Sequence, residues 1–307
     1  MIDFHSHITT PGSSMPAQDG DYYQAIRPAV QSGEWVNMVW QETIELMAEN
    51  LRTPAMLKSY RHMAPLIYSE MSRRMMLTNA DRMMIEMAKH DVRQAVVVAM
   101  DPYVPTSELV AACLKTKDIL IPFGSVDPWA DDWRDKLDET LSLPISGYKF
   151  HFALQQLPFG SERMQAIVER IEKKRPTLPI YMHAGDFPIY KPLDEHWATA
   201  MDRFLDQFPE LTFVCGHCGW NEPSAALRSA RRHPNLYLET SWQPPGVIRR
   251  LCQALGPHRL LMGSDFPLFS MRRAVANCKA ALSPEEFVLV SETNAKNLLA
   301  TGRQGGY

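Results

Sequence analysis

Eight short apolar runs, each followed by a longer segment with helical periodicity, are the feature that most restricts the fold of this 307-residue chain. The runs are rich in β-branched and aromatic residues and are bounded by turn residues, as strands are. They are Ile2–His7, Gln94–Met100, Leu120–Val126, Gly147–His151, Pro179–His183, Thr212–His217, Leu236–Ser241 and Leu260–Ser264. Strands that alternate with helices form a parallel sheet, and eight such units in about 300 residues fit a closed (β/α)₈ TIM barrel better than an open sheet.

The segments between the runs are predicted to be helices. They are Asp81–His90, Thr106–Lys117, Asp131–Leu141, Ser161–Lys174, His196–Phe208, Glu222–Arg232 and Gly246–Leu255. Three further helices, Met271–Ala281, Ser283–Val290 and Asn294–Ala300, are expected to close the barrel, and residues 302–307 to form a tail. Val96, Val97 and Val98 are apolar without alternation, as expected when both faces of a strand are covered.

The connection after the first strand is far longer than the few residues typical of such barrels. Residues 8–79 are therefore interpreted as an insertion within a single barrel domain that covers residues 1–307. It begins with Pro11-Gly12-Ser13-Ser14 and is predicted to contain helices at Tyr22–Gln31, Val36–Asn50 and Thr53–Tyr60. Because it leaves the C-terminal end of a strand, it is expected to lie over the active-site face as a lid or a subunit contact.

The composition describes an ordinary globular protein, with 45% hydrophobic residues, 22% charged residues and a formal net charge of −3. No broad basic surface for nucleic acid is indicated, and no apolar run is long enough to span a membrane. The N-terminus has no secretory pattern, so a cytoplasmic location is expected. Five scattered cysteines suggest reduced thiols, and we favour structural thiols over redox chemistry for the C-x-x-C pair Cys215 and Cys218.

Side chains that can bind metal are concentrated at the C-terminal ends of the predicted strands. His5 and His7 lie two residues apart, so on a strand both imidazoles share one side, while Phe4 and Ser6 take the other. Imidazole is the commonest protein ligand for metals such as zinc, although the pair alone is also consistent with two partly exposed strand histidines. The other strand-end residues are Lys149, His151, His183, His217 and Asp265. In a barrel all of them can meet at one mouth.

Five segments resemble the successive strand motifs of the amidohydrolase superfamily. They are Ile2–His7, Gly147–His151, Tyr181–Gly185, Cys215–Gly219 and Met262–Pro267, with Asn294–Leu298 similar to the usual closing segment. The similarity covers nearly the whole chain. It is greatest to the branch that contains aminocarboxymuconate-semialdehyde decarboxylase and γ-resorcylate decarboxylase.

The resemblance implies one divalent metal ion, most often Zn²⁺ with Mn²⁺ as an alternative, bound by His5, His7, His183 and Asp265. A cation with three imidazoles and one carboxylate leaves room for a water whose pKa it lowers. Asp265 could accept that water's proton, and His217 would act beside the metal as an acid or base. Taken alone, Asp265 could instead be a helix N-cap.

Lys149 is open to two interpretations. In binuclear relatives a carboxylated lysine bridges two metals, whereas we expect an uncarboxylated Lys149 that, with His151, could hold a substrate carboxylate. Arginines of the insertion, Arg52, Arg61, Arg73 and Arg74, could reach an anionic group or remain solvated. Trp220 and Trp242 could line the pocket or serve packing alone. Asp101 and Asp127, each followed by proline, are expected to serve turns.

These residues predict a metal-dependent hydrolase that uses activated water against an amide, ester or lactone of a small carboxylate-bearing compound. The alternative is a metal-dependent, non-oxidative decarboxylase of an aromatic or unsaturated acid, because both chemistries use the same ligands. A non-catalytic barrel is the third hypothesis, and the complete ligand set argues against it. The partner is a small molecule in either enzyme, and the apolar-rich insertion makes a homodimer plausible.

Overall fold

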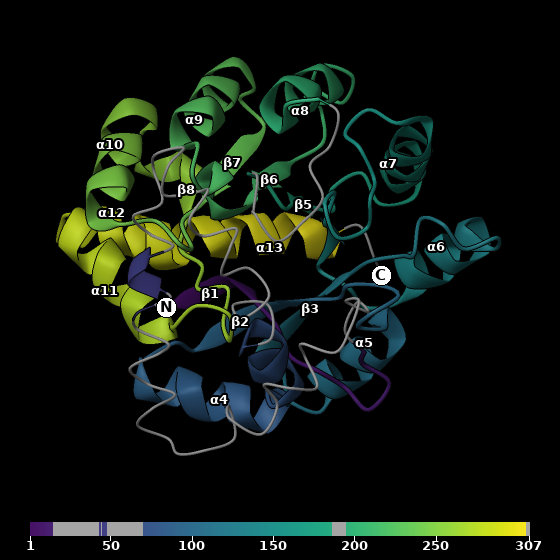
Figure 1. Ribbon diagram of the computed structural model, residues 1–307, viewed down its shortest axis with the longest axis horizontal. Coiled ribbons are helices and arrows are strands. Elements are labelled where there is room, and N and C mark those ends of the chain that lie inside the picture. The colour runs from purple at the N-terminus through teal and green to yellow at the C-terminus, as the bar shows by residue number, and fades with distance from the viewer. Residues whose placement is uncertain (15–42, 44, 48–69, 186–194, 305–307) are drawn as a thin grey trace.

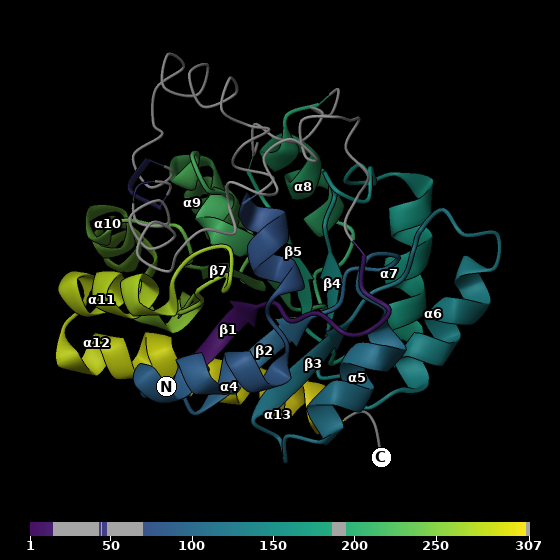
Figure 2. The same ribbon diagram turned by 60° about the horizontal axis from the view of Figure 1, so that its bottom comes forward.

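Eight parallel strands lie side by side in the order in which they occur in the sequence, as Figures 1 and 2 show. This computed structural model describes residues 1–14, 43, 45–47, 70–185 and 195–304. The strands are β1 (Ile2–Ser6), β2 (Gln94–Val98), β3 (Leu120–Gly124), β4 (Gly147–Phe150), β5 (Ile180–Met182), β6 (Phe213–Cys215), β7 (Leu236–Glu239) and β8 (Leu260–Leu261). Each predicted strand is present, and the predicted TIM barrel is confirmed.

The seam between β1 and β8 is joined by backbone hydrogen bonds. The Phe4 N–H donates to the Met262 carbonyl at 2.9 Å, and the Asp265 N–H donates to the His5 carbonyl at 2.7 Å. Ser6 and Phe266 then form a parallel bridge. The first strand and the residues after the last strand are thereby fixed against each other, which places His5 beside Asp265.

Helices alternate with the strands and surround the barrel (Figure 1). They are α4 (Ala80–Lys89), α5 (Thr106–Leu114), α6 (Trp133–Ser142), α7 (Glu162–Lys174), α8 (Trp197–Leu205), α9 (Pro223–Arg232) and α10 (Pro245–Leu255), followed by α11 (Met271–Ala281), α12 (Pro284–Val288), η3 (Leu289–Thr293) and α13 (Asn294–Gln304). Short polar residues begin several of them. Ser161 caps α7 by accepting from the Met164 N–H, and Ser283 forms a capping box with Glu286 at α12.

Two apolar clusters account for the core. The larger one lies between the strands and the helices, and the smaller one fills the barrel with side chains such as Val96, Val98 and Phe123. Phe4 was expected on the side opposite His5, but its ring packs edge-on against Phe123 in the inner cluster, with centroids 5.7 Å apart. The prediction of strict alternation is wrong here, because the register of β1 against β2 shifts between Asp3 and Ser6.

The described ends of the predicted insertion lie against each other. Residues 70–76 are helical, and the Thr9 N–H donates to the Thr78 carbonyl at 2.7 Å. Of the predicted helix Val36–Asn50, residues 43 and 45–47 are described, and they are helical. The predicted helices Tyr22–Gln31 and Thr53–Tyr60, together with Arg52 and Arg61, lie outside the described residues. The proposed lid or subunit contact stays a prediction.

The C-terminal boundary differs from the predicted tail at 302–307, because α13 continues to Gln304. Gly302 is buried, and the Arg175 guanidinium donates to its carbonyl at 3.4 Å. A β-carbon at Gly302 would lie 2.9 Å from the Ser146 carbonyl oxygen, so close packing against the barrel extends the helix past Ala300.

Within the described residues, no helix combines the length and apolar character needed to cross a bilayer. All five cysteines are buried and carry free thiols, as predicted. Burial raises the pKa of the Cys215 thiol, which disfavours the thiolate that disulfide exchange requires.

Candidate metal centre and active site

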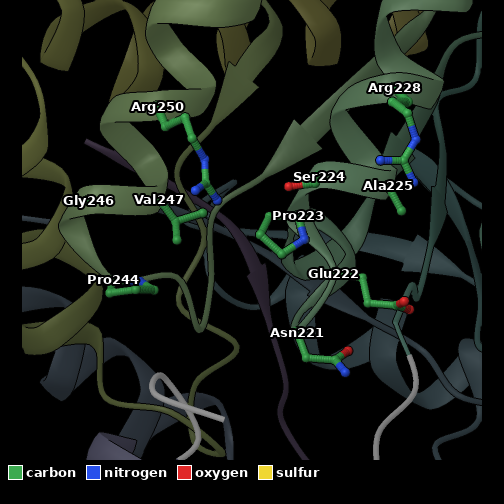
Figure 3. A pocket seen from close by; sticks show the side chains of 10 residues that line it. All are labelled: Asn221, Glu222, Pro223, Ser224, Ala225, Arg228, Pro244, Gly246, Val247 and Arg250. Carbon is green, nitrogen blue, oxygen red and sulfur yellow. The ribbon is translucent and has the colours of Figure 1, made fainter. Parts of the chain in front are cut away.

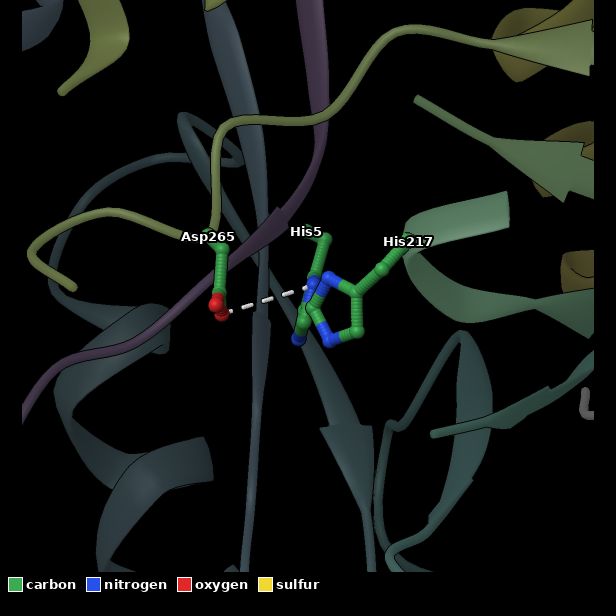
Figure 4. A group of neighbouring side chains, drawn as sticks. All are labelled: His5, His217 and Asp265. Carbon is green, nitrogen blue, oxygen red and sulfur yellow. Dashed lines mark ion pairs between the residues drawn. The ribbon is translucent and has the colours of Figure 1, made fainter. Parts of the chain in front are cut away.

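The strand-end residues predicted to meet are brought together at the C-terminal face of the barrel. His5 lies on β1, His183 directly follows β5, and His217 lies in the short turn η1 (Gly216–Gly219) after β6. All of these side chains, with His7 and Asp265, are at most 7% exposed. Three of them, His5, His217 and Asp265, have ligand atoms that all lie within 4.8 Å of one another, and Figure 4 shows the three converging.

The other two predicted ligands adjoin this group of three. His7 Nε2 lies 2.9 Å from Asp265 Oδ1, and His183 Nδ1 lies 3.1 Å from His217 Nε2. His5 Nδ1 is 3.5 Å from the same Asp265 oxygen. The predicted ligands therefore form one buried cluster with His217, although the most compact group contains His217 in place of His7 and His183.

Asp265 is held in a backbone conformation that non-glycine residues rarely adopt, with φ of 59°. The N–H groups of Leu268 and Phe269 donate to its carbonyl, and Trp242 Nε1 donates to its Oδ2 at 2.6 Å. The alternative role as a helix N-cap is excluded, because Ser270 caps the following helix α11. Its carboxylate is thus free to face the histidines.

Burial sets the protonation of the cluster. It lowers the pKa of His5 and of His183 well below the usual range, and it lowers the pKa of His217 to about 4 although Asp265 opposes this shift. Burial alone would raise the pKa of Asp265, but His217, His7 and the Trp242 N–H outweigh it and hold that pKa low. At neutral pH His5, His183 and His217 are therefore neutral imidazoles beside the ionised carboxylate of Asp265.

Such a donor set fits a divalent cation, which requires unprotonated imidazole and ionised carboxylate ligands. His7 Nδ1 is also buried without a hydrogen-bond partner among the described residues, so its lone pair could serve a cation. His5, His7, His183 and Asp265 are thus suited to hold the metal that the sequence predicts, with His217 at its side.

Lys149 places a fully buried amine in the same site. Its Nζ lies 3.4 Å from His5 Nε2 and 4.1 Å from the centroid of the Tyr181 ring. Burial lowers the pKa of Lys149 to about 7, against the opposing charges of Asp265 and Glu239. His151 stacks on His183 with ring centroids 3.8 Å apart. Both residues predicted on β4 therefore adjoin the cluster.

The tryptophans and arginines that were predicted to contact substrate differ in how close they lie to the histidine cluster. Trp242 touches the site through Asp265, and Trp220 is buried at 2% exposure. Arg73 donates through Nε and Nη2 to the Glu70 carboxylate, both at 2.9 Å, so its guanidinium group is already paired with Glu70. Arg74 is 7% exposed and donates to Glu70 and, at 3.2 Å, to the Leu268 carbonyl in the turn that carries Asp265.

Two buried acids near the site were missed by the sequence reasoning. Asp3 accepts from the backbone N–H groups of His5 and Ser264, and burial raises its pKa to about 7. Glu239, at the end of β7, is fully buried and accepts from the Tyr181 hydroxyl at 2.6 Å. The signal for each was a carboxylate within a short apolar strand, where a charged group needs nearby partners.

A pocket of about 560 Å³ lies apart from this cluster, between the starts of α9 and α10. Figure 3 shows Arg228 and Arg250 on its two sides. No residue of the histidine cluster lines it.

A family model described as amidohydrolase matches residues 2–300. The chain belongs to this amidohydrolase family. The match agrees with the strand motifs and with the buried histidine and carboxylate cluster. None of the curated proteins matches this amidohydrolase at a significant level.

Solved structures similar to this amidohydrolase have the same fold. One is 2,6-dihydroxybenzoate decarboxylase from Rhizobium, with a TM-score of 0.65, 15% identity and coverage of 97% of this chain and 98% of that one. Another is 5-carboxyvanillate decarboxylase from Novosphingobium aromaticivorans, complexed with manganese and a nitrobenzoic acid, with a TM-score of 0.63, 16% identity and coverage of 97% and 95%.

A third is a probable 2-pyrone-4,6-dicarboxylic acid hydrolase from Acinetobacter baumannii, with a TM-score of 0.60, 14% identity and coverage of 97% of this chain and 98% of that one. At these identities the likeness shows the fold alone. The named neighbours include both decarboxylases and a hydrolase.

Proposed function

We propose that this amidohydrolase is a metal-dependent hydrolase that acts on an amide, ester or lactone of a small compound bearing a carboxylate. The observation that carries the proposal is the convergence of His5, His217 and Asp265, with Lys149 beside them, in one buried site. A divalent cation, Zn²⁺ or Mn²⁺, held by His5, His7, His183 and Asp265 would supply Lewis acidity and lower the pKa of a coordinated water.

The protonation of this chain's own side chains favours hydrolysis. Asp265 is ionised and His217 is neutral at pH 7, so both can accept a proton from an attacking water. Lys149, whose pKa is about 7, can carry the positive charge that attracts a substrate carboxylate or supply the proton that a leaving group takes. His151, stacked on His183, lies where it can contact the same substrate.

Decarboxylation is the second candidate, and the two decarboxylases among the structural neighbours favour it. In that reaction the carbon that loses carbon dioxide must gain a proton. Lys149, whose pKa burial lowers to about 7, would be the proton donor. The other groups would hold the carboxylate that departs.

Product analysis separates the two candidates. The protein is loaded with Zn²⁺ or Mn²⁺ and incubated with two panels, one of aromatic and unsaturated carboxylic acids and one of carboxylate-bearing lactones, esters and amides. Ring opening or acid release in the second panel without carbon dioxide from the first supports hydrolysis. Carbon dioxide release with no turnover of the second panel would establish the decarboxylase instead. His258→Ala, which changes an exposed histidine in η2 (Pro257–Arg259), is the control for His5→Ala.

A further inference from the structure

Glu239 lies beneath the histidine cluster and is linked to two of its members through single hydroxyl groups. The Tyr181 hydroxyl donates to Glu239 Oε2 at 2.6 Å and lies 2.8 Å from His5 Nδ1. The Ser241 hydroxyl donates to the same oxygen at 2.8 Å and lies 2.7 Å from His217 Nδ1. Glu239 makes no direct hydrogen bond to either ring, because its Oε2 lies 3.6 Å from His5 Nδ1 and 3.9 Å from His217 Nδ1.

The Glu239 carboxylate acts as an acceptor in all of these contacts. Besides the two hydroxyls, it accepts from the backbone N–H of His217 at 3.1 Å and from the backbone N–H of Ser241. A backbone N–H can only donate, and a carboxylate has about four acceptor positions on its two oxygens. Three of these donors reach Oε2 and one reaches Oε1, and all four contacts suit an ionised carboxylate, whose hydrogen bonds oppose the rise in the pKa of Glu239 that burial causes.

The number of available hydrogens then determines which nitrogen of each ring, His5 and His217, carries the hydrogen. Each hydroxyl has one hydrogen, and if that hydrogen goes to Glu239, the hydroxyl oxygen can only accept from the histidine. His5 and His217 must accordingly carry their ring hydrogen on Nδ1. A neutral imidazole has one N–H, so the Nε2 atom of each ring keeps its lone pair. The neighbours of the two Nε2 atoms agree with this, because both can donate. Lys149 Nζ lies 3.4 Å from His5 Nε2, and His183 Nδ1 lies 3.1 Å from His217 Nε2.

The geometry points to Glu239 as a positioning residue that acts through Tyr181 and Ser241 to hold the ring hydrogens of His5 and His217 on Nδ1, which leaves the lone pair of each ring on Nε2. One buried carboxylate would thus prepare a metal ligand and a base together. The consequence for metal binding rests on the proposed function, whereas the ring tautomers do not, because they are defined in the metal-free protein.

The test measures the tautomers by NMR on protein that is labelled with ¹⁵N at histidine and freed of metal with a chelator. In the wild-type protein at pH 7.5 both rings should show the Nδ1–H form. Tyr181→Phe should change the spectrum of His5 and leave His217 unchanged, and Ser241→Ala should do the reverse. Tyr148→Phe is the matched control, because it removes a buried tyrosine hydroxyl that makes no hydrogen bond to the site residues.

Glu239→Gln should alter the spectra of both rings. If that variant does not fold, Tyr181→Phe and Ser241→Ala still test the inference.

Metal affinity is the second measurement, made by competition of Zn²⁺ against a chromogenic chelator. Loss of a partner that orients a metal-binding histidine typically weakens binding by about 10- to 100-fold, and this is expected for Tyr181→Phe but not for Tyr148→Phe. An Nε2–H form of either ring in the wild-type protein would overturn the inference. If the tautomers respond as stated while Zn²⁺ affinity does not, the positioning role stands and the assignment of His5 as a metal ligand fails.

Discussion

Asp265 is the residue through which the two ends of the chain meet in the site. Its Oδ1 contacts His7 across 258 positions of sequence, and its Oδ2 accepts from Trp242. The backbone strain at φ of 59° is offset by the hydrogen bonds of Leu268 and Phe269 to its carbonyl. The side chain is therefore aimed at the histidines by the turn itself.

We expect Asp265→Asn to abolish metal binding and activity while leaving the fold intact. The amide keeps the size of the carboxylate and can still accept from Trp242, but it loses the charge that a divalent cation needs. Bound metal should fall well below one ion per chain, and turnover should drop by more than the roughly 10- to 100-fold that is typical when a partner of a metal ligand is lost. Elemental analysis of protein purified without chelator and steady-state kinetics measure these effects. Wild-type metal content in Asp265→Asn would remove this residue from the ligand set.

Gly263 is predicted to be intolerant of any side chain, because a β-carbon there would lie 2.3 Å from Glu239 Oε1. Gly263→Ala would displace the buried carboxylate, and overpacking of this kind costs about 1–3 kcal/mol. Gly246→Ala, in the first turn of α10, is the control, since a β-carbon there meets no atom within 4 Å. Urea denaturation should show a loss for the first variant and none for the second. Equal stabilities would show that Glu239 can move freely.

At the scale of elements, the helical residues 70–76 are fastened to the turn after β8 by one buried ion-pair network. Glu70 is 1% exposed and binds both Arg73 and Arg74, and Arg74 reaches the Leu268 carbonyl. Leu268 in turn donates to the Asp265 carbonyl. The end of the insertion is thus coupled to the turn that carries a metal-binding candidate.

Glu70→Gln should destabilise the protein in a pH-dependent way. Burial alone would raise the pKa of Glu70, but the two arginines outweigh it and lower the pKa below its usual 4.5. A lowered pKa means that the charged pair stabilises the fold above pH 4.5, and that this contribution is lost as pH falls through the folded-state pKa. Removing one partner of a buried pair costs about 3 kcal/mol, so the deficit should be near that value at pH 7 and shrink in acid.

The control for this prediction is Glu86→Gln. Glu86 pairs with Lys89 and His90 on the surface of α4, where an ion pair contributes at most about 1 kcal/mol. Unfolding free energies from urea titrations at several pH values compare the two variants. A deficit in Glu70→Gln that is the same in acid and at neutral pH would show that the charge of Glu70 is not its source.

Elements were the part of the fold that the sequence predicted best. Apolar runs and helical periodicity indicate local structure, and strict alternation leaves a parallel barrel as the natural arrangement, so β1 to β8 followed from the sequence. The location of the strand-end histidines and Asp265 on one face followed as well, because the C-terminal ends of parallel strands meet there. The register shift in β1 that turns Phe4 inward has no counterpart in the apolar pattern.

Contacts across the barrel were not predictable in the same way. Tyr181 on β5 and Glu239 on β7 belong to strands that are not neighbours, so their hydrogen bond depends on how the barrel closes. The proximity of His217 to His5 and Asp265, closer than the predicted grouping, has the same origin. Residue types identify which side chains can bind metal, whereas their distances are set by the tilt and stagger of all eight strands.

At the scale of the whole molecule, the site lies across the seam of the barrel. His5 and His7 come from the first strand and its end, and Asp265 comes from the turn after the last strand, where backbone bonds already join β1 to the residues after β8. A cation bound by these residues would add a further link between the two ends of the sheet. Metal binding and global stability should therefore be coupled.

We expect removal of metal to lower the unfolding temperature and its return to restore it. A ligand at about 100 times its dissociation constant stabilises the folded state by about 2.7 kcal/mol, which for a chain of this size is a shift of about 4 °C. Calorimetry of chelated protein before and after addition of Zn²⁺ or Mn²⁺ measures the shift. It should be absent in Asp265→Asn and present in His258→Ala.

Elemental analysis of the metal-loaded protein decides the role of Lys149. One ion per chain agrees with a free amine, whereas two ions that fall to one in Lys149→Met would establish a carboxylated lysine that bridges them.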